Sequence, residues 1–360
     1  MAFELESYLS SSIEKIIKNA IRASLKKPNM SLFLAQYALS SKVAQKRRVE
    51  HSTGTHIPPF LIASITNKCN LYCKGCYSRA NNTCNDTENT QQLDVIEWSG
   101  IFQEATELGI GFILLAGGEP LIRKNVIKSA AKYPSIIFPI FTNGTMIDET
   151  YMTLFHKNRK LLPVHSNEGD VTITDTRRGY GIYKQLMTTM DAMHLQGIFY
   201  GRSITVSMAN IDNVTSTIFL DELYTRGCKL VVFVEYVPID GQSDELALDD
   251  NARILMDQRL NQIRKTYEDM VVISFPGDEK SSGGCLAAGR GFFHINPDGG
   301  AEPCPFSPYS DSNLKDMTLL EALSSPLFQK LKDSSILLQE HTGGCVLFQQ
   351  ESLVKELLSK

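Results

Sequence analysis

The sequence predicts an α/β fold built on a parallel sheet. From residue 56 onward, six short apolar runs alternate with stretches that have helical apolar spacing. Such regular alternation is typical of parallel strands joined by crossover helices. Glycine-rich and polar segments directly follow the strands. Because the carboxyl ends of parallel strands form the edge where binding sites are built, we expect the functional residues there.

The individual elements follow from their apolar patterns. Short apolar runs predict strands at residues 57–66, 112–116, 136–141, 161–165, 201–208 and 230–237. Apolar residues three or four apart predict helices at residues 94–108, 125–132, 149–158, 182–195 and 215–225. Further on, residues 292–295 and the turn Pro297-Asp298-Gly299-Gly300 predict a β-hairpin, and residues 318–332 predict a helix.

The first 55 residues predict a separate helical segment. Apolar residues at helical spacing predict an amphipathic helix over residues 5–27; they are Ile13, Ile16, Ile17, Ile21 and Leu25. Its polar side carries Lys15, Lys18, Arg22, Lys26 and Lys27. Pro28 ends it, and a second helix follows around residues 32–43.

This segment leaves two alternatives open. Its helices pack on the rest of the chain, or residues 1–27 lie on an anionic membrane surface. Residues 1–50 hold nine Lys and Arg against four Asp and Glu. We expect packing, because the first helix lacks the Trp and Phe anchors of interfacial helices.

Composition narrows the class of protein. Apolar residues make up 42% of the 360 residues and charged residues 21%, as in ordinary globular proteins. The sequence has no apolar run of membrane-spanning length and no signal-peptide pattern, which predicts a cytoplasmic protein with reduced thiols. A net charge of −4 gives no general case for binding nucleic acid.

Three cysteines directly after the first strand are the most informative motif. Cys69, Cys73 and Cys76 have the spacing C-x3-C-x2-C within eight residues. Such a loop can ligate three irons of a cubane cluster, which normally takes four thiolates, and so leaves one iron open. The alternative is a zinc or structural site. Zinc sites more often show two separated C-x2-C pairs or combine Cys with His.

The second strand ends in Gly117-Gly118-Glu119-Pro120. A strand-ending turn is the simple explanation of this run alone. Together with the cysteine loop, it resembles the radical S-adenosylmethionine (radical SAM) superfamily. The resemblance implies a partial (βα)6 TIM-like barrel. It also implies a [4Fe-4S] cluster on Cys69, Cys73 and Cys76, with S-adenosylmethionine on the open iron. A side chain at Gly118 is then expected to obstruct the methionine amino group.

The resemblance extends to polar residues at later strand ends. Residues of this kind meet the ribose and methionine parts of S-adenosylmethionine in the family; here they are Asn143, Ser166, Glu168 and Ser207. Each alone is equally explained as a cap or turn residue. Asp175, Arg177 and Arg178 are expected in a charged loop, which is either solvated or a clamp for an anionic substrate.

The C-terminal part resembles the SPASM and twitch extensions of the family. Cys285, the hairpin with Cys304, and Cys345 match their pattern. A full SPASM domain has about seven cysteines, whereas only these three are present here. The resemblance therefore implies one auxiliary iron–sulfur cluster, expected to be [4Fe-4S]. Its fourth ligand stays open among His341, Cys84, Cys228, water and substrate. A zinc site is the alternative. The expected domains are 1–55, 56–275 and 276–360.

The function implied by the resemblance is reductive cleavage of S-adenosylmethionine to a 5′-deoxyadenosyl radical, which abstracts a hydrogen atom. The extension suggests a peptide or protein substrate. The absence of a winged-helix pattern in residues 1–55 keeps a lipid, isoprenoid or small metabolite open. Ferredoxin or flavodoxin is the expected reductant. A non-enzymatic electron-transfer protein is the alternative of another class.

Overall fold

A computed structural model describes residues 5–25, 28–52, 54–87, 91–338 and 345–359. Its centre is one curled sheet of nine strands in the order β7-β6-β5-β4-β3-β2-β1-β8-β9. The strands are β1 (Phe60–Ser64), β2 (Phe112–Ala116), β3 (Phe138–Thr142), β4 (Leu161–Asn167), β5 (Gly201–Val206), β6 (Leu230–Glu235), β7 (Val271–Phe275), β8 (His294–Ile295) and β9 (Ala301–Glu302). Neighbours are parallel except β8 and β9, so the predicted parallel sheet is confirmed.

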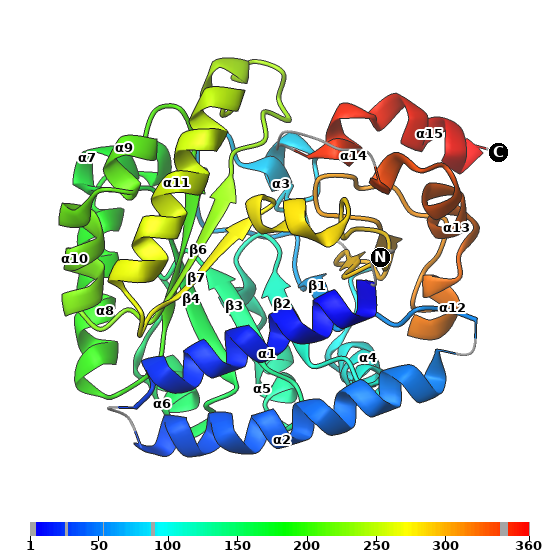
Figure 1. Ribbon diagram of the computed structural model, residues 1–360, viewed down its shortest axis with the longest axis horizontal. Helices are drawn as coiled ribbons and strands as arrows, with labels where there is room; N and C mark the ends of the chain where they lie inside the picture. Colours follow the sequence, from blue (N-terminus) through cyan, green and yellow to red (C-terminus); the bar gives the residue numbers. More distant parts are fainter. Residues whose placement is uncertain (1–4, 26–27, 53, 88–90, 339–344, 360) are drawn as a thin grey trace.

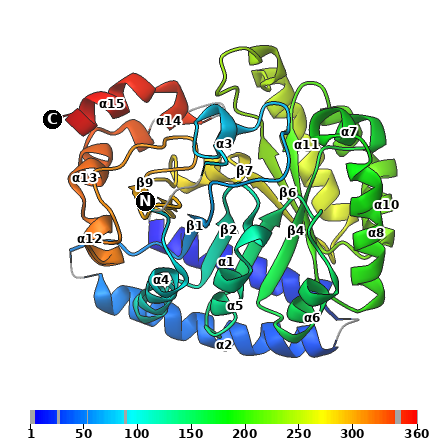
Figure 2. The same cartoon turned by 180° about the vertical axis from the view of Figure 1, so that it is seen from behind.

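Crossover helices cover the outer face of this partial barrel (Figures 1 and 2). They are α4 (Val95–Leu108), α5 (Lys124–Ala130), α6 (Glu149–Lys157), α8 (Ile182–Leu195), α10 (Thr217–Thr225) and α11 (Asp250–Thr266). Helix α4 shows how the sequence sets an element. Asp94 and Glu97 form a capping box at its start, and Gly109 ends it in the left-handed region with a φ of 82°.

The structure differs from the predicted six units in two places. Helix α11 and β7 form a seventh unit, which the sequence analysis did not expect. Only four residues of α11 are buried, Ala252, Met256, Leu260 and Ile263, so its apolar stripe is narrow. The prediction of a charged loop at Asp175–Arg178 is also wrong. These residues belong to α7 (Val171–Arg178), because the side chain of Asp170 accepts a hydrogen bond from Ile173 N and caps the helix.

The C-terminal part continues the barrel sheet. The predicted hairpin is confirmed as β8 and β9, and β8 pairs parallel with β1, with Ile62 opposite His294. The helix expected over 318–332 is broken into α12 (Leu319–Leu323) and α13 (Pro326–Asp333). Ser325 caps the second helix, and Pro326 stands at its first position. Two helices end the described chain, α14 (Val346–Gln349) and α15 (Glu351–Ser359).

The N-terminal helices close the concave face of the barrel from below. In Figure 1, α1 (Leu5–Ala23) crosses in front of the lower strands, and α2 (Pro28–His51) runs beneath them. Ile17 is buried in one cluster with Leu162 of β4 and Val232 of β6, against which Ile13, Ile16 and Ile21 also pack. The packing alternative is thus confirmed for α1. None of the described helices is long and apolar enough to cross a membrane.

Candidate active site

The predicted cysteine loop lies between β1 and the short helix α3 (Tyr77–Ala80), at the carboxyl edge of the sheet. The side chain of Arg79 returns from α3 and donates to the carbonyl oxygens of Cys69 and Leu71 at 3.3 and 2.8 Å. Arg79 also pairs with Asp86 at 2.8 Å, and Asp86 accepts from the backbone N–H of Cys69 at 2.9 Å. Arg79 and Asp86 therefore hold the loop through its backbone groups and do not bind its thiols.

The donor set fits an iron–sulfur cluster. Cys69, Cys73 and Cys76 are all partly exposed. A hydrogen bond from the Cys84 thiol lowers the pKa of Cys69 to about 6, although burial opposes this. Among the described residues, no three Cys, His, Asp or Glu side chains converge on one point as a single metal ion requires. A cubane asks for a wider arrangement, because each thiolate binds a different iron.

The Gly-Gly-Glu-Pro turn is joined directly to this loop. Gly118 N donates to Thr66 O at 2.9 Å, and Glu119 N donates to Lys68 O at 2.8 Å. Gly117 has a φ of 130°, and a Cβ there would stand 2.5 Å from Thr66 O. The glycines are needed because two backbone segments approach this closely. Pro120 begins the 3-10 helix η1 (Pro120–Arg123) and is buried.

Replacing Gly118 with alanine is expected to displace the cysteine loop. The added Cβ would stand 2.2 Å from Lys68 O and 3.0 Å from Cys69 N, so backbone must move. A Cβ at Gly118 would thus meet the cysteine loop, while the docking of the methionine amino group at Gly118 stays a prediction. We expect less iron and sulfide per chain after anaerobic reconstitution. Gly100→Ala is the matched control, since a Cβ there meets nothing within 4 Å. Equal iron contents in the two variants would contradict this prediction.

Glu119 ties the ends of two strands together. Its carboxylate accepts from Thr142 Oγ1 at 2.7 Å, Asn143 N at 2.8 Å and Leu121 N at 3.0 Å. Burial raises the pKa of Glu119 to about 7, while these hydrogen bonds oppose the shift. The Asn143 side chain donates to Asn70 Oδ1, within the cysteine loop, at 2.8 Å. Both residues therefore shape the edge around the loop.

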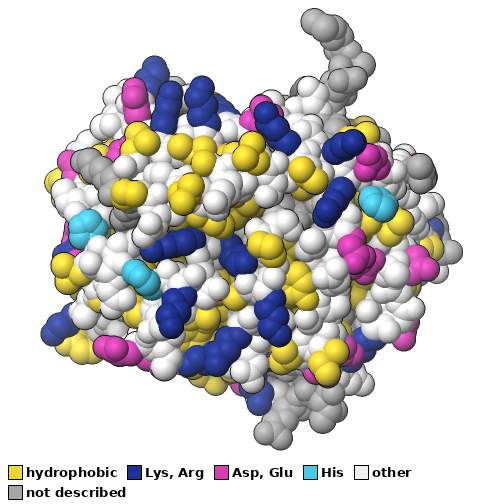
Figure 3. Space-filling view, turned by 90° about the horizontal axis from the view of Figure 1, so that it is seen from below, with side chains coloured by type: hydrophobic (Ala, Val, Ile, Leu, Met, Phe, Trp, Pro, Cys, Tyr) yellow, Lys and Arg dark blue, Asp and Glu magenta, His cyan; other side chains and the backbone are white. Residues whose placement is uncertain are grey.

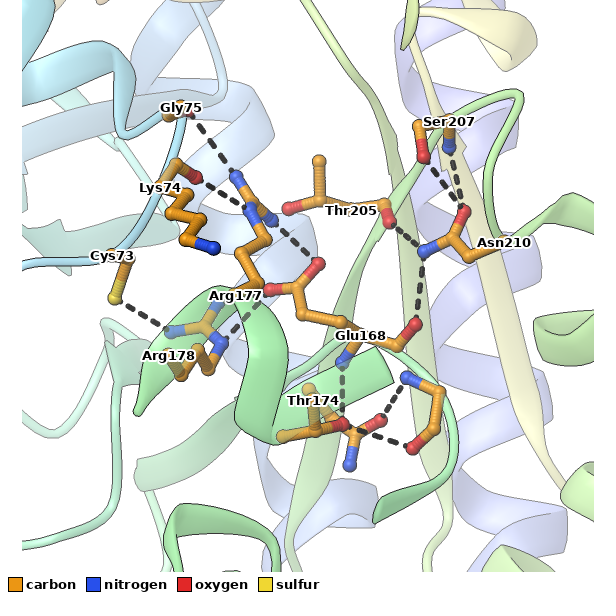
Figure 4. A network of polar contacts seen from close by, with 12 residues as sticks. Cys73, Lys74, Gly75, Glu168, Thr174, Arg177, Arg178, Thr205, Ser207 and Asn210 are labelled. Carbon is orange, nitrogen blue, oxygen red and sulfur yellow. Dashed lines mark hydrogen bonds and ion pairs between the residues drawn. The ribbon is translucent and has the colours of Figure 1, made fainter. Parts of the chain in front are cut away.

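A buried ionic network fixes the other side of the loop (Figure 4). The carboxylate of Glu168, which is only 1% exposed, pairs with both Arg177 and Arg178 of α7. Arg177 also donates to Lys74 O at 3.0 Å, and Nη1 of Arg178 lies 3.9 Å from Cys73 Sγ. Glu168 thus occupies both guanidinium groups. They are not the free clamp for an anionic substrate that the sequence left open.

The two predicted serines differ in their surroundings. Val164 of β4 belongs to the cluster that faces α1, so Ser166, two residues on, also faces the concave side. Ser166 is only partly buried and lies in register with Ser203 of β5. Ser207 is buried, and its N–H donates to Asn210 Oδ1 at 2.7 Å. Asn210 in turn donates to Glu168 O at 2.9 Å, so Ser207 belongs to the turn that supports the network.

A second polar chain, which the sequence analysis missed, joins the hairpin to β1. His294 Nδ1 lies 2.6 Å from Glu302 Oε2, and His294 Nε2 lies 2.7 Å from Ser64 Oγ. All three residues are buried. Ser64 shares a face with Ile62, the register partner of His294, at the carboxyl end of β1. This chain links both strands of the hairpin to the end of β1. No sequence signal indicates it, because the pairing of β8 with β1 is needed to form it.

The C-terminal cysteines come together from three distant segments. Cys285 follows the 3-10 helix η3 (Gly277–Ser282), Cys304 follows β9, and Cys345 precedes α14. A hydrogen bond from Cys304 lowers the pKa of Cys345, while burial raises that of Cys304 well above its usual range. The thiolate of Cys285 acts electrostatically on Cys304. Cys304 and Cys345 are therefore neighbours, and Cys285 lies within electrostatic range of Cys304.

The candidate fourth ligands are also placed. Cys84 is buried beside Cys69, at the first cysteine loop, and Cys228 is a buried core thiol whose Sγ lies 3.3 Å from Leu230 O. His341 lies outside the described residues. Tyr77 lies between the two groups of cysteines. Burial is the main cause that raises its pKa, and the charges of Cys76, Cys304 and Cys84 raise it further. Its ring packs edge-on against Phe306, with the ring centroids 5.1 Å apart.

Comparison with known proteins adds an independent finding. Residues 63–216 match the family model of the radical SAM superfamily. The AdoMet-dependent heme synthase of Methanosarcina barkeri is 24% identical over 318 residues, covering 81% of this chain and 88% of that protein. The PqqA peptide cyclase of Gluconobacter oxydans is 22% identical over 290 residues, covering 76% and 79%.

A solved structure shares the fold. The crystal structure of Streptococcus suis SuiB bound to S-adenosylmethionine matches with a TM-score of 0.67 at 15% identity, covering 86% of this chain and 78% of that one. The two chains therefore share their fold over most of this chain. The cysteine loop sits where the family match begins, and the turn at Gly117 and Gly118 lies within it. Residues 63–216 of this chain therefore carry a radical SAM domain, and the chain as a whole is similar to enzymes that share it.

Proposed function

We propose that this enzyme modifies a peptide or protein by hydrogen abstraction within the barrel. The observation that carries the proposal is the cysteine loop, held on one side by Gly118 and Glu119 and on the other by Arg177 and Arg178. Cys69, Cys73 and Cys76 would hold a [4Fe-4S] cluster at the mouth of the concave face. When bound, the cluster and S-adenosylmethionine supply the 5′-deoxyadenosyl radical that abstracts the hydrogen.

The chain's own residues position and shield the reactants. Asn143 and Ser166 lie at the edge where the ribose and methionine parts of S-adenosylmethionine would bind. Ser207 and Glu168 support that edge through Asn210. The apolar cluster of α1 excludes water from below. A one-electron donor such as ferredoxin or flavodoxin would reduce the cluster, and a reducing cytoplasm would keep the thiols intact.

Proteins that are similar to this chain in sequence, and others that are similar in structure, support a peptide substrate. Besides the PqqA peptide cyclase, the chain is similar to the sporulation killing factor maturation protein SkfB of Bacillus subtilis, at 22% identity over 72% of this chain and 63% of that protein. The structure of SuiB bound to its precursor peptide SuiA has a TM-score of 0.66 and covers 90% of this chain. The heme synthase match is the observation that favours a small-molecule substrate instead.

The test is turnover of S-adenosylmethionine with candidate substrates. The reconstituted, dithionite-reduced enzyme should form 5′-deoxyadenosine, and a peptide encoded beside its gene should gain a mass change that depends on S-adenosylmethionine. Cleavage of S-adenosylmethionine together with modification of a tetrapyrrole, but of no peptide, would favour the small-molecule alternative. No cleavage at all would refute the function.

We further propose that Cys285, Cys304 and Cys345 hold an auxiliary [4Fe-4S] cluster. We expect about eight irons per chain, four for each cluster, and about four after all three cysteines are changed to alanine. The triple variant should still cleave S-adenosylmethionine but should fail to complete substrate turnover. Four irons in the unmodified enzyme, with zinc at the second site, would refute the auxiliary cluster and leave the first cluster intact.

A further inference from the structure

The outward face of α2 carries exposed apolar side chains among its polar ones, although α2 already buries the opposite face. Met30, Leu34 and Tyr37 point into the protein. Leu32, Leu39 and Val43, here called the α2 stripe, have exposed fractions of 61%, 69% and 54%. Their spacing of seven and four residues places them in one line along the helix, about half a turn away from the buried face. A helix buried on one side should be polar on the other.

Exposed apolar side chains are concentrated here. Fifteen large hydrophobic residues of the described chain are exposed, and five of them lie between residues 25 and 49. Beyond the α2 stripe these are Leu25, at the end of α1, and Val49, near the end of α2. Single exposed hydrophobics need no explanation, but a contiguous row on one surface indicates an interaction site.

Cations surround the α2 stripe. Lys42, Lys46 and Arg47 are exposed on α2, and Lys15, Lys18 and Arg22 are exposed on α1. Lys46 faces Glu50 at 3.6 Å. Seen from below, hydrophobic side chains and Lys or Arg alternate across the middle of this face, while Asp and Glu lie mostly toward its rim (Figure 3). The surface thus combines apolar and positively charged groups.

We propose that the α2 stripe and the cations around it dock the enzyme on an anionic lipid surface. Apolar side chains that enter the acyl boundary and Lys or Arg that meet anionic headgroups are the combination such a surface binds. A second copy of this chain fits less well, because it would bring like charges together. The proposed site is α2 and not residues 1–27, for which packing was expected, because α1 packs its apolar face on the barrel.

The orientation is compatible with catalysis. In Figure 1, α2 lies below the amino ends of the strands, whereas α3 and α7, which hold the cysteine loop, lie at the opposite end. A lipid surface under α2 would leave the mouth of the barrel facing away from it. Docking would therefore locate the enzyme without covering its site, and the proposal does not depend on which substrate is modified.

Co-sedimentation of the full-length holoenzyme with vesicles tests this. We expect binding to vesicles of phosphatidylcholine and phosphatidylglycerol, little binding to phosphatidylcholine alone, and release as salt is raised. Leu32→Gln combined with Leu39→Gln should weaken the binding roughly tenfold, because two apolar side chains no longer enter the lipid. Lys42→Glu combined with Lys46→Glu should also weaken it. The matched control is Ile96→Gln with Ile218→Gln, whose side chains are 80% and 85% exposed on α4 and α10.

Each other outcome overturns the proposal. No binding by the unmodified enzyme, equal binding to neutral vesicles, or binding that survives loss of Leu32 and Leu39 would each refute it. A dimer that dissociates in the leucine variant, without vesicle binding, would show that a second copy is the occupant. Melting temperature and iron content should be the same in all variants, which separates docking from folding and from the function proposed above.

Discussion

Changing Cys73 to alanine is expected to abolish formation of 5′-deoxyadenosine while the barrel remains folded. Cys73 lies in the loop after β1, partly exposed, and its Sγ faces Arg178 at 3.9 Å. A cluster held by three thiolates has no spare protein ligand, so loss of one should prevent stable assembly. The large apolar clusters of the barrel do not include Cys73, so the thermal unfolding transition should change little.

The measurement is chromatographic detection of 5′-deoxyadenosine after anaerobic reconstitution and reduction with dithionite. Cys228→Ala is the matched control, because Cys228 is a buried thiol just before β6 whose Sγ contacts Leu230 O. It should keep the activity. A Cys73→Ala variant that still forms the product would mean that this loop does not hold the catalytic cluster.

Changing Glu168 to alanine is expected to have the largest effect on stability among single changes at the site. Glu168 is 1% exposed, and it pairs with the guanidinium groups of Arg177 and Arg178. Removing one partner of a buried ion pair leaves charge uncompensated, at about 3–5 kcal/mol. Arg177 also binds the carbonyl oxygens of Lys74 and Gly75, so the cysteine loop should loosen as well.

Denaturant unfolding and iron content together check this prediction. Asp212→Ala is the control, because Asp212 pairs with Arg259 but its side chain is 84% exposed. Exposed pairs contribute about 0–1 kcal/mol, so this control should unfold like the original enzyme. If both variants are equally stable and hold equal iron, the network does not support the loop as argued here.

The barrel could be predicted because its signals are local. An apolar run such as Phe112–Ala116 predicted β2 with both bounds correct, and Asp94 marked the start of α4. The same local reasoning missed α11, in which only four of 17 residues are buried, and with it the short strand β7 that follows. It also missed α7, whose short sequence is mostly polar and charged.

The candidate active site likewise has features that the sequence predicted and features that it did not. The cysteine spacing and the Gly-Gly-Glu-Pro turn are contiguous in sequence, so their chemistry could be inferred directly. The contact of Gly118 with Lys68 could not be inferred, because the two residues are fifty positions apart in the sequence. The partners of Glu168 lie on a helix that was not expected, and those of His294 come from two different strands. These contacts arise only when the sheet closes, so no local pattern indicates them.

The placement of α1 has a consequence for the order of events during turnover. Ile17 and its neighbours fill the lower concave face, so that end of the barrel is closed by the described residues. The carboxyl edge of the strands, where the cysteine loop lies, is then the entrance that reactants and products would share. A substrate long enough to cover it would confine 5′-deoxyadenosine and methionine until the substrate itself departs, whereas a small substrate would let them exchange independently. The size of the substrate thus decides whether release is sequential or random.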